Sequence, residues 1–117
     1  MILIVDDEPD IRDSLQEFFE DEGYEVATAA NGAEALQRLA SGKLPCVILL
    51  DLLMPVLDGN EMYARMQEDP RLSGVPVIIS TSDPRRAPSG LLTLKKPVSL
   101  VRLATEVRKL CGEPARA

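Results

Sequence analysis

Short apolar runs alternate with amphipathic stretches along almost the whole chain. The first run, Ile2–Val5, is rich in β-branched residues and stops abruptly at Asp6, as is typical of a buried strand. Similar runs predict four further strands, at 24–29, 46–50, 75–80 and 91–94. The run at 46–50 is apolar at every position, which indicates a central strand of a parallel sheet covered by helices on both faces.

Helical spacing of apolar residues follows most of these strands. Pro9 suits the first turn of a helix that Gly23 ends, and a second helix around Ala35–Ala40 is closed by Gly42. A third helix is centred on Met62 and Met66, and a last one carries Leu100, Leu103, Val107 and Leu110 on one face. This order predicts an α/β fold, a doubly wound five-stranded parallel sheet with helices on both faces.

The crossover between the fourth and fifth strands does not fit the alternation. Only residues 82–90 separate these strands, whereas a parallel crossover normally takes about a dozen residues or more and contains a helix. Pro84, Pro88 and Gly90 break helices, so we expect a missing helix or a single turn here.

Composition narrows the class of protein. The 117 residues suffice for one domain, expected at 1–111, with 112–117 a flexible tail or linker stub. The net charge of −6 argues against direct binding of nucleic acid, and the absence of a long apolar stretch argues against a membrane partner. No secretion signal is visible, so we expect a cytoplasmic protein. In a reducing cytosol, Cys46 and Cys111 are expected to be small buried hydrophobes rather than a disulfide or metal pair.

Charged and hydroxyl side chains gather where the predicted strands end. The first strand ends at Asp6, Asp7 and Glu8, the third at Asp51, the fourth at Ser80–Ser82, and the fifth at Lys95 and Lys96. Ligands of open α/β sheets collect at this edge. Crowded carboxylates raise one another's pKa unless a cation intervenes, and oxygen ligands suit Mg²⁺ or Mn²⁺.

Each residue also has an ordinary structural explanation when it is taken alone. Acids favour the first turn of a helix, Thr81 could be a strand-end residue, and Lys96 a solvated lysine. Asp51 is different because it follows five apolar residues without a break, where a carboxylate faces a large desolvation penalty.

Together these segments resemble the response regulator receiver family over nearly the whole chain. The segments that carry the resemblance are Ile2–Glu8, Val47–Pro55, Asp58–Gly59, Pro76–Thr81 and Lys96–Pro97. The resemblance implies the flavodoxin-like strand order 2-1-3-4-5, for which a chemotaxis member of the family is a standard example. It also implies a cis peptide bond between Lys96 and Pro97.

The family's chemistry assigns a role to each strand-end residue. Asp51 would accept a phosphoryl group from a histidine kinase, a phosphotransfer protein or a small phosphodonor. Mg²⁺, or Mn²⁺, would be held by Asp6, Asp7, Asp51 and the backbone carbonyl of Leu53, with Glu8 in support. Lys96, the Thr81 hydroxyl and the Ser82 backbone N–H would bind phosphoryl oxygens. The side chains of Leu53 and Asp83 would flank the path of the hydrolytic water.

The chain departs from the family on its expected output face. The fourth helix is expected to be lost or reduced to one turn, and Thr93 stands where the family usually carries an aromatic switch residue. Output could therefore run through the first helix, the loop 82–90 or dimerisation. The downstream partner is not identified by the sequence, and a phosphoryl shuttle, a diffusible switch and an excised input domain all remain open.

Three other interpretations each match part of the sequence. A receiver that binds partners without phosphorylation would explain the lost helix and Thr93, but it gives no reason to keep a buried Asp51. An aspartyl phosphatase would usually carry a second aspartate at the position of Leu53. A flavodoxin-type cofactor binder needs a Ser/Thr/Gly-rich phosphate loop where the acidic Asp6–Glu8 lies. We therefore expect a signalling protein rather than an enzyme that turns over outside substrates.

Overall fold

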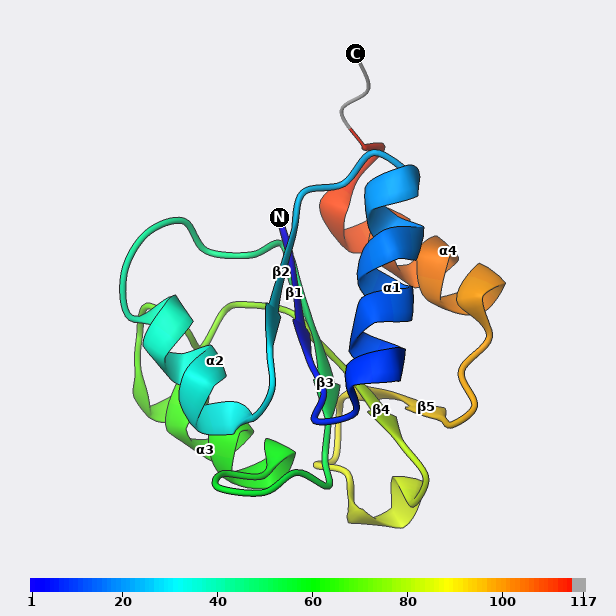
Figure 1. The fold of residues 1–117 in the computed structure, drawn as a ribbon. Coiled ribbons are helices and arrows are strands. Elements are labelled where there is room, and N and C mark those ends of the chain that lie inside the picture. Colours follow the sequence, from blue (N-terminus) through cyan, green and yellow to red (C-terminus); the bar gives the residue numbers. More distant parts are fainter. Residues whose placement is uncertain (115–117) are drawn as a thin grey trace.

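The computed structural model describes residues 1–114 as one sheet sandwiched between two helical layers (Figure 1). The strands are β1 (Ile2–Val5), β2 (Val26–Ala29), β3 (Val47–Asp51), β4 (Val77–Thr81) and β5 (Leu92–Lys95). The helices are α1 (Pro9–Asp21), α2 (Gly32–Leu39), α3 (Gly59–Glu68) and α4 (Leu100–Cys111), with a short 3₁₀ turn, η1 (Pro84–Arg86). Of the predicted tail, residues 115–117 lie outside the described part.

All neighbouring strands are parallel, and their order is β2-β1-β3-β4-β5. Both the α/β class and the strand order are therefore confirmed. The Lys96–Pro97 peptide bond is cis, as the family resemblance implied.

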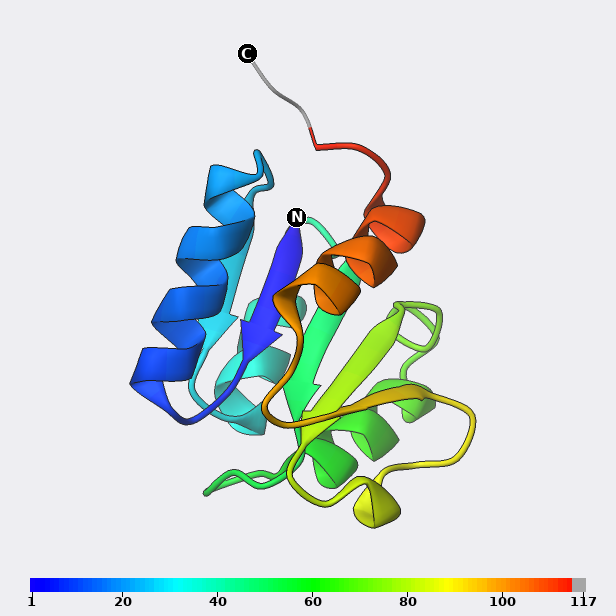
Figure 2. The same ribbon diagram turned by 90° about the vertical axis from the view of Figure 1, so that its right-hand side faces the viewer.

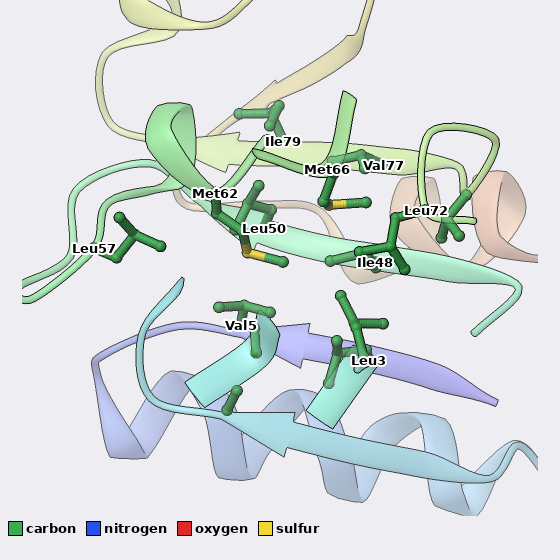
Figure 3. Close-up of a cluster of buried hydrophobic side chains, with 14 of the residues drawn as sticks. Leu3, Val5, Ile48, Leu50, Leu57, Met62, Met66, Leu72, Val77 and Ile79 are labelled. Carbon is green, nitrogen blue, oxygen red and sulfur yellow. The ribbon is translucent and has the colours of Figure 1, made fainter. Parts of the chain in front are cut away.

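Alternating strand residues fill two cores. Leu3, Val5, Ile48 and Leu50 face α2 and α3, where Met62 and Met66 of α3 cover them (Figure 3). The alternate residues of the same strands face α1 and α4 and contact Phe19, Leu103 and Val107. Because β3 lies between two strands and two helical layers, all five of its residues are buried. The apolar run that predicted a central strand thus has the expected environment.

The β4–β5 crossover contains the single turn η1 in place of a helix (Figure 2). Asn60 at the start of α3 anchors this turn, since its Nδ2 donates to the Arg86 carbonyl at 3.0 Å. Ala87 and Leu91 of the crossover contact the core that α2 and α3 cover. The prediction of a fourth helix lost or reduced to one turn is confirmed. Ala87 and Leu91 help to cover the face of the sheet on which α2 and α3 pack.

The expectation of two unlinked cysteines is wrong. Cys46 and Cys111 form a disulfide, with Cα atoms 5.2 Å apart. Helix α4 runs back across the sheet and packs on β3, so its last residue returns to the edge where β3 begins (Figure 1). The separation of 65 residues in the sequence conceals this proximity, because it only appears once the order of the strands and the direction of α4 are known.

Candidate functional site

The carboxyl ends of β1, β3, β4 and β5 bring the predicted residues to one edge of the sheet. Asp6 and Asp7 follow β1, Asp51 and Thr81 end β3 and β4, and Lys96 follows β5. The register pairs Asp51 with Ser80 and Thr81 with Lys95, so these strand ends are level with one another. Asp6, Asp51 and Thr81 are the buried polar residues of this structure, within residues 1–114.

Asp6 is fixed on three sides. Its backbone N–H donates to the Ala29 carbonyl at 3.2 Å, and its Oδ1 accepts the backbone N–H of Glu8 at 2.9 Å. Arg12 of α1 reaches back and donates from Nη1 to the Asp6 carbonyl at 2.8 Å. Sequence reasoning missed Arg12, although its place one turn into the helix that follows Asp6 was an available signal. These contacts fix the backbone of the acidic turn.

Lys96 is the cation inside the acidic group. Its Nζ lies 3.0 Å from Oδ2 of Asp6 and 3.6 Å from Oδ1 of Asp51, and its side chain is 17% exposed. Desolvation acts to lower the pKa of Lys96, but the hydrogen bond to Asp6 and the charges of Asp51, Asp6 and Glu8 together outweigh it and raise the pKa. Lys96 therefore stays charged and bridges two buried carboxylates.

The environment of Asp51 strongly shifts the pKa of its carboxyl. Burial raises the pKa of its carboxyl from 3.8 to about 6, and the negative charges of Asp6 and Asp7 act in the same direction. The positive charge of Lys96 and a hydrogen bond from the Leu53 backbone N–H act to lower the pKa but do not outweigh the burial. The ionised carboxylate is thus held at a desolvation cost that Lys96 offsets only in part.

The acidic turn offers a set of oxygen ligands. Carboxylate oxygens of Asp6, Asp7 and Glu8 lie within 4.8 Å of one another, and Asp6 shares Lys96 with Asp51. Carboxylates in this arrangement suit Mg²⁺ or Mn²⁺, which take oxygen ligands and keep several waters. A hard divalent cation fits the residues present, because the charges of Asp6 and Asp7 act on the buried Asp51 carboxylate together and Lys96 is the side-chain cation that opposes them.

Thr81 and the residues after it form the other wall of the site. Thr81 is fully buried, and its Oγ1 accepts the backbone N–H of Asp83 at 3.1 Å. The Asp83 carboxylate pairs with Arg85 at 3.1 Å and Arg86 at 3.5 Å, and the hydrogen bond from Arg85 lowers its pKa. Asp83 is therefore engaged by the η1 arginines in this structure, while Ser82 is exposed beside Thr81.

The loop from β3 to α3 is held close against the end of β3. A Cβ added to Gly59 would lie 2.8 Å from the Leu52 Cα, so only glycine fits at this position. Val56 has φ of +70° and is 82% exposed, a conformation that β-branched residues rarely adopt. Nothing in the sequence signalled Val56, because its conformation depends on how the loop is closed by Gly59 and by the Leu57 carbonyl, which accepts the Gly32 N–H at 3.0 Å.

Among residues 1–114, no helix is both long and apolar enough to cross a bilayer.

Known proteins agree with this architecture. A solved signal receiver domain of a histidine kinase from Syntrophus aciditrophicus is 33% identical, with a TM-score of 0.84, and the match covers 99% of this chain and 92% of that one. The response regulator TrrA from Thermotoga maritima, solved in complex with Mg²⁺–BeF, is 34% identical with a TM-score of 0.80, over 93% of this chain and 96% of that one.

A longer relative shows the same segment inside a larger protein. Response regulator PleD of Caulobacter vibrioides is 38% identical over 93% of this chain, and this chain spans only 25% of PleD. The family of response regulator receiver domains matches residues 2–108. These domains are signalling modules of two-component systems. With its sheet order, its strand-end acids and this match, the chain belongs to the response regulator receiver domain family.

Proposed function

We propose that this chain is a phosphoacceptor switch of a two-component system and is phosphorylated on Asp51. The observation that carries the proposal is the buried Asp51 carboxylate at the end of β3, with Lys96 Nζ at 3.6 Å and the acidic turn beside it. A carboxylate that costs desolvation energy, at the ligand-binding edge of an α/β sheet, is explained by a role in group transfer.

In the proposed reaction an oxygen of Asp51 attacks the phosphorus of a phosphohistidine or of a small acyl phosphate. The bond from phosphorus to the donor breaks as the bond to Asp51 forms, and the product is an aspartyl phosphate. Lys96 then exchanges its contact with Asp51 for a phosphoryl oxygen, and moves little because its Nζ is already at the site. The Thr81 hydroxyl donates to a second phosphoryl oxygen, and the Ser82 backbone N–H supports the same group.

A divalent cation, Mg²⁺ or Mn²⁺, would supply positive charge to the attacking carboxylate and to the phosphoryl oxygens. Asp6, Asp7 and Asp51 would hold it with the Leu53 carbonyl, and Glu8 would support it through water. The hydrogen bonds from the Glu8 N–H and Arg12 to Asp6 keep the acidic turn in place for that purpose. TrrA, 34% identical, was solved with Mg²⁺–BeF, which supports the assignment.

The test is the mass of the intact protein after incubation with acetyl phosphate and Mg²⁺. We expect one phosphoryl adduct on the wild type, none on Asp51→Asn and none after chelation of the metal. Asp58→Asn is a matched control, because Asp58 caps α3 on the same loop but lies outside the proposed chemistry. An adduct that survives in Asp51→Asn would place the chemistry elsewhere.

A receiver that binds partners without phosphorylation is the second candidate, because it would account equally well for the crossover without a helix and for Thr93. The two candidates differ in the binding of beryllofluoride, which requires a working acceptor and metal site but no turnover. No adduct and no Mg²⁺-dependent beryllofluoride binding would support the second candidate and reject the first.

The phosphoryl donor is proposed to be a histidine kinase or a phosphotransfer protein in the cytoplasm, with no outside substrate turned over. Residues 1–111 would form the receiver, and 112–117 a tail or linker stub. The chain spans only part of relatives such as PleD, so the output is proposed to be a contact with another protein or a further segment.

A further inference from the structure

The two cysteines of this chain meet at the end of the sheet opposite the proposed phosphoryl site. Cys46 directly precedes β3, whose other end is Asp51, and Cys111 is the last residue of α4. Asp51 lies five positions after Cys46 along the extended chain, which corresponds to about 16 Å. Since the sequence contains two cysteines in all, no other thiol of the chain competes for either sulfur.

The disulfide lies at the partly exposed margin of the core that α1 and α4 cover. Cys46 and Cys111 are both half-buried. In contrast, Val47, which follows Cys46 on β3, and Val107, which precedes Cys111 on α4, are fully buried. A thiol from solution would therefore need to open only this margin of the fold, and not the sheet, to reach the bond.

The disulfide links the last residue of α4 covalently to the start of β3. The first two turns of α4 are seated by Leu103 and Val107, which are buried against the sheet, whereas Leu110 in the last turn is 44% exposed. Beyond Cys111, the Gly112 carbonyl accepts a hydrogen bond from the Tyr24 hydroxyl at 2.8 Å. Without the covalent bond, the end of α4 would be held by noncovalent contacts such as this exposed hydrogen bond and the packing of Cys111 against the core.

We propose that Cys46 and Cys111 form a reversible redox site that fixes or releases the end of α4. The inference rests on the proposed function for one point, the cytoplasmic compartment. In that compartment disulfides are rare, and those that occur are usually transient or redox-sensing. The segment that leaves α4 would therefore respond to thiol redox state as a second input, separate from phosphorylation of Asp51.

The reductant is a dithiol, either a small molecule or a protein with a Cys-X-X-Cys site. Its thiolate attacks one of the two Sγ atoms, the Sγ–Sγ bond breaks, and a mixed disulfide forms while the other cysteine leaves as a thiolate. The second thiol of the reductant then attacks the mixed disulfide and releases the remaining cysteine. The net change is a two-electron reduction of the pair to two thiols and oxidation of the dithiol to its disulfide. A small disulfide such as oxidised glutathione reverses the reaction in two exchange steps.

The experiment equilibrates the folded protein in glutathione buffers of graded ratio, traps free thiols with N-ethylmaleimide, and measures intact mass. We expect the species with no label to be replaced by the species with two labels as the buffer becomes reducing, without denaturant. A bond that stays closed in excess dithiothreitol until the protein is unfolded would overturn the proposal in favour of a structural disulfide. Two free thiols under oxidised glutathione would overturn it as well.

Hydrogen exchange tests the consequence for α4. Reduction should speed amide exchange in residues 108–113 by at least about tenfold and leave 47–51 unchanged. The double variant Cys46→Ser/Cys111→Ser has no thiol, so it should match the reduced wild type and be insensitive to the buffer. Unchanged exchange at 108–113 on reduction would overturn the release of α4. All these readouts concern thiols and amides, so they stay interpretable if phosphorylation fails, and acetyl phosphate labelling is expected to be equal in both redox states.

Discussion

At the scale of single residues, the desolvation of the buried Asp51 carboxylate should make the stability of the protein depend on pH. Its pKa is raised from 3.8 to about 6 by burial, so the folded protein binds this proton more tightly than the unfolded chain does. The free energy of unfolding should therefore fall as pH rises from about 4 to about 6, by up to about 3 kcal/mol for this group. Urea unfolding in the presence of a chelator measures it.

Asp51→Asn removes the titration, so the variant should lack this fall and exceed the wild type in stability at pH 7. Asp13→Asn removes the same charge from an exposed position of α1 and serves as the control. Parallel pH curves for the wild type and Asp51→Asn would show that Asp51 is not destabilised by its site.

Lys96 should have the opposite effect on stability, because it neutralises two buried carboxylates at 3.0 and 3.6 Å. Lys96→Met should lower the free energy of unfolding at pH 7 by about 3 kcal/mol in metal-free buffer, since it leaves buried charge without a partner. Mg²⁺ should restore part of the loss by supplying charge to the same oxygens. The adjacent Lys95 is exposed, so Lys95→Met is a matched control that should change little. Equal losses in both variants would mean that the two ion pairs contribute nothing specific.

At the scale of elements, the start of α3 depends on how closely it approaches β3. In Gly59→Ala the new Cβ would lie 2.8 Å from the Leu52 Cα, and backbone would have to move to accept it. We expect the free energy of unfolding to fall by about 2 kcal/mol or more. Mg²⁺ binding should also weaken, because Leu53, whose carbonyl is a proposed metal ligand, directly follows Leu52. Gly74→Ala meets no atom within 4 Å and should leave both quantities unchanged. Urea unfolding and a Mg²⁺ titration of the two variants distinguish a local fit from a general effect of glycine.

The elements also show which information the sequence contained. Strand and helix positions were predictable because the apolar period is local, and the site could be placed because parallel strands end at one edge. The helix missing between β4 and β5 was predictable from Pro84, Pro88 and Gly90, which act within their own segment. The strand order came from family resemblance, since periodicity does not reveal which strands are neighbours.

What the sequence did not reveal depends on contacts between distant segments. The Cys46–Cys111 bond, the contact of Arg12 with the Asp6 carbonyl and the positive φ of Val56 all follow from how finished elements meet. The polar contacts of Asp83 depend less on distant segments. Its arginine partners are two and three residues away, but the chain has to turn at η1 before they can reach it.

At the scale of the whole molecule, the excess of negative charge and the proposed metal site should make the stability of the protein depend on divalent cations. The chain carries a net charge of −6, and three carboxylates of the acidic turn lie within 4.8 Å of one another. A ligand that binds only the folded state stabilises it by mass action, so Mg²⁺ at one hundred times its Kd should add about 2.7 kcal/mol, or about 10 °C in Tm.

The expected rise in Tm should come from Mg²⁺ bound at the site and not from screening of charge. NaCl at matched ionic strength separates the two effects, because it screens charge without occupying the site. Asp7→Asn should therefore lose most of the Mg²⁺-dependent rise, while Asp13→Asn on the exposed face of α1 should keep it. Differential scanning calorimetry over a Mg²⁺ series gives both quantities. A rise of the same size with NaCl, or one that persists in Asp7→Asn, would contradict a metal site at the acidic turn, because net charge alone would then account for the stabilisation.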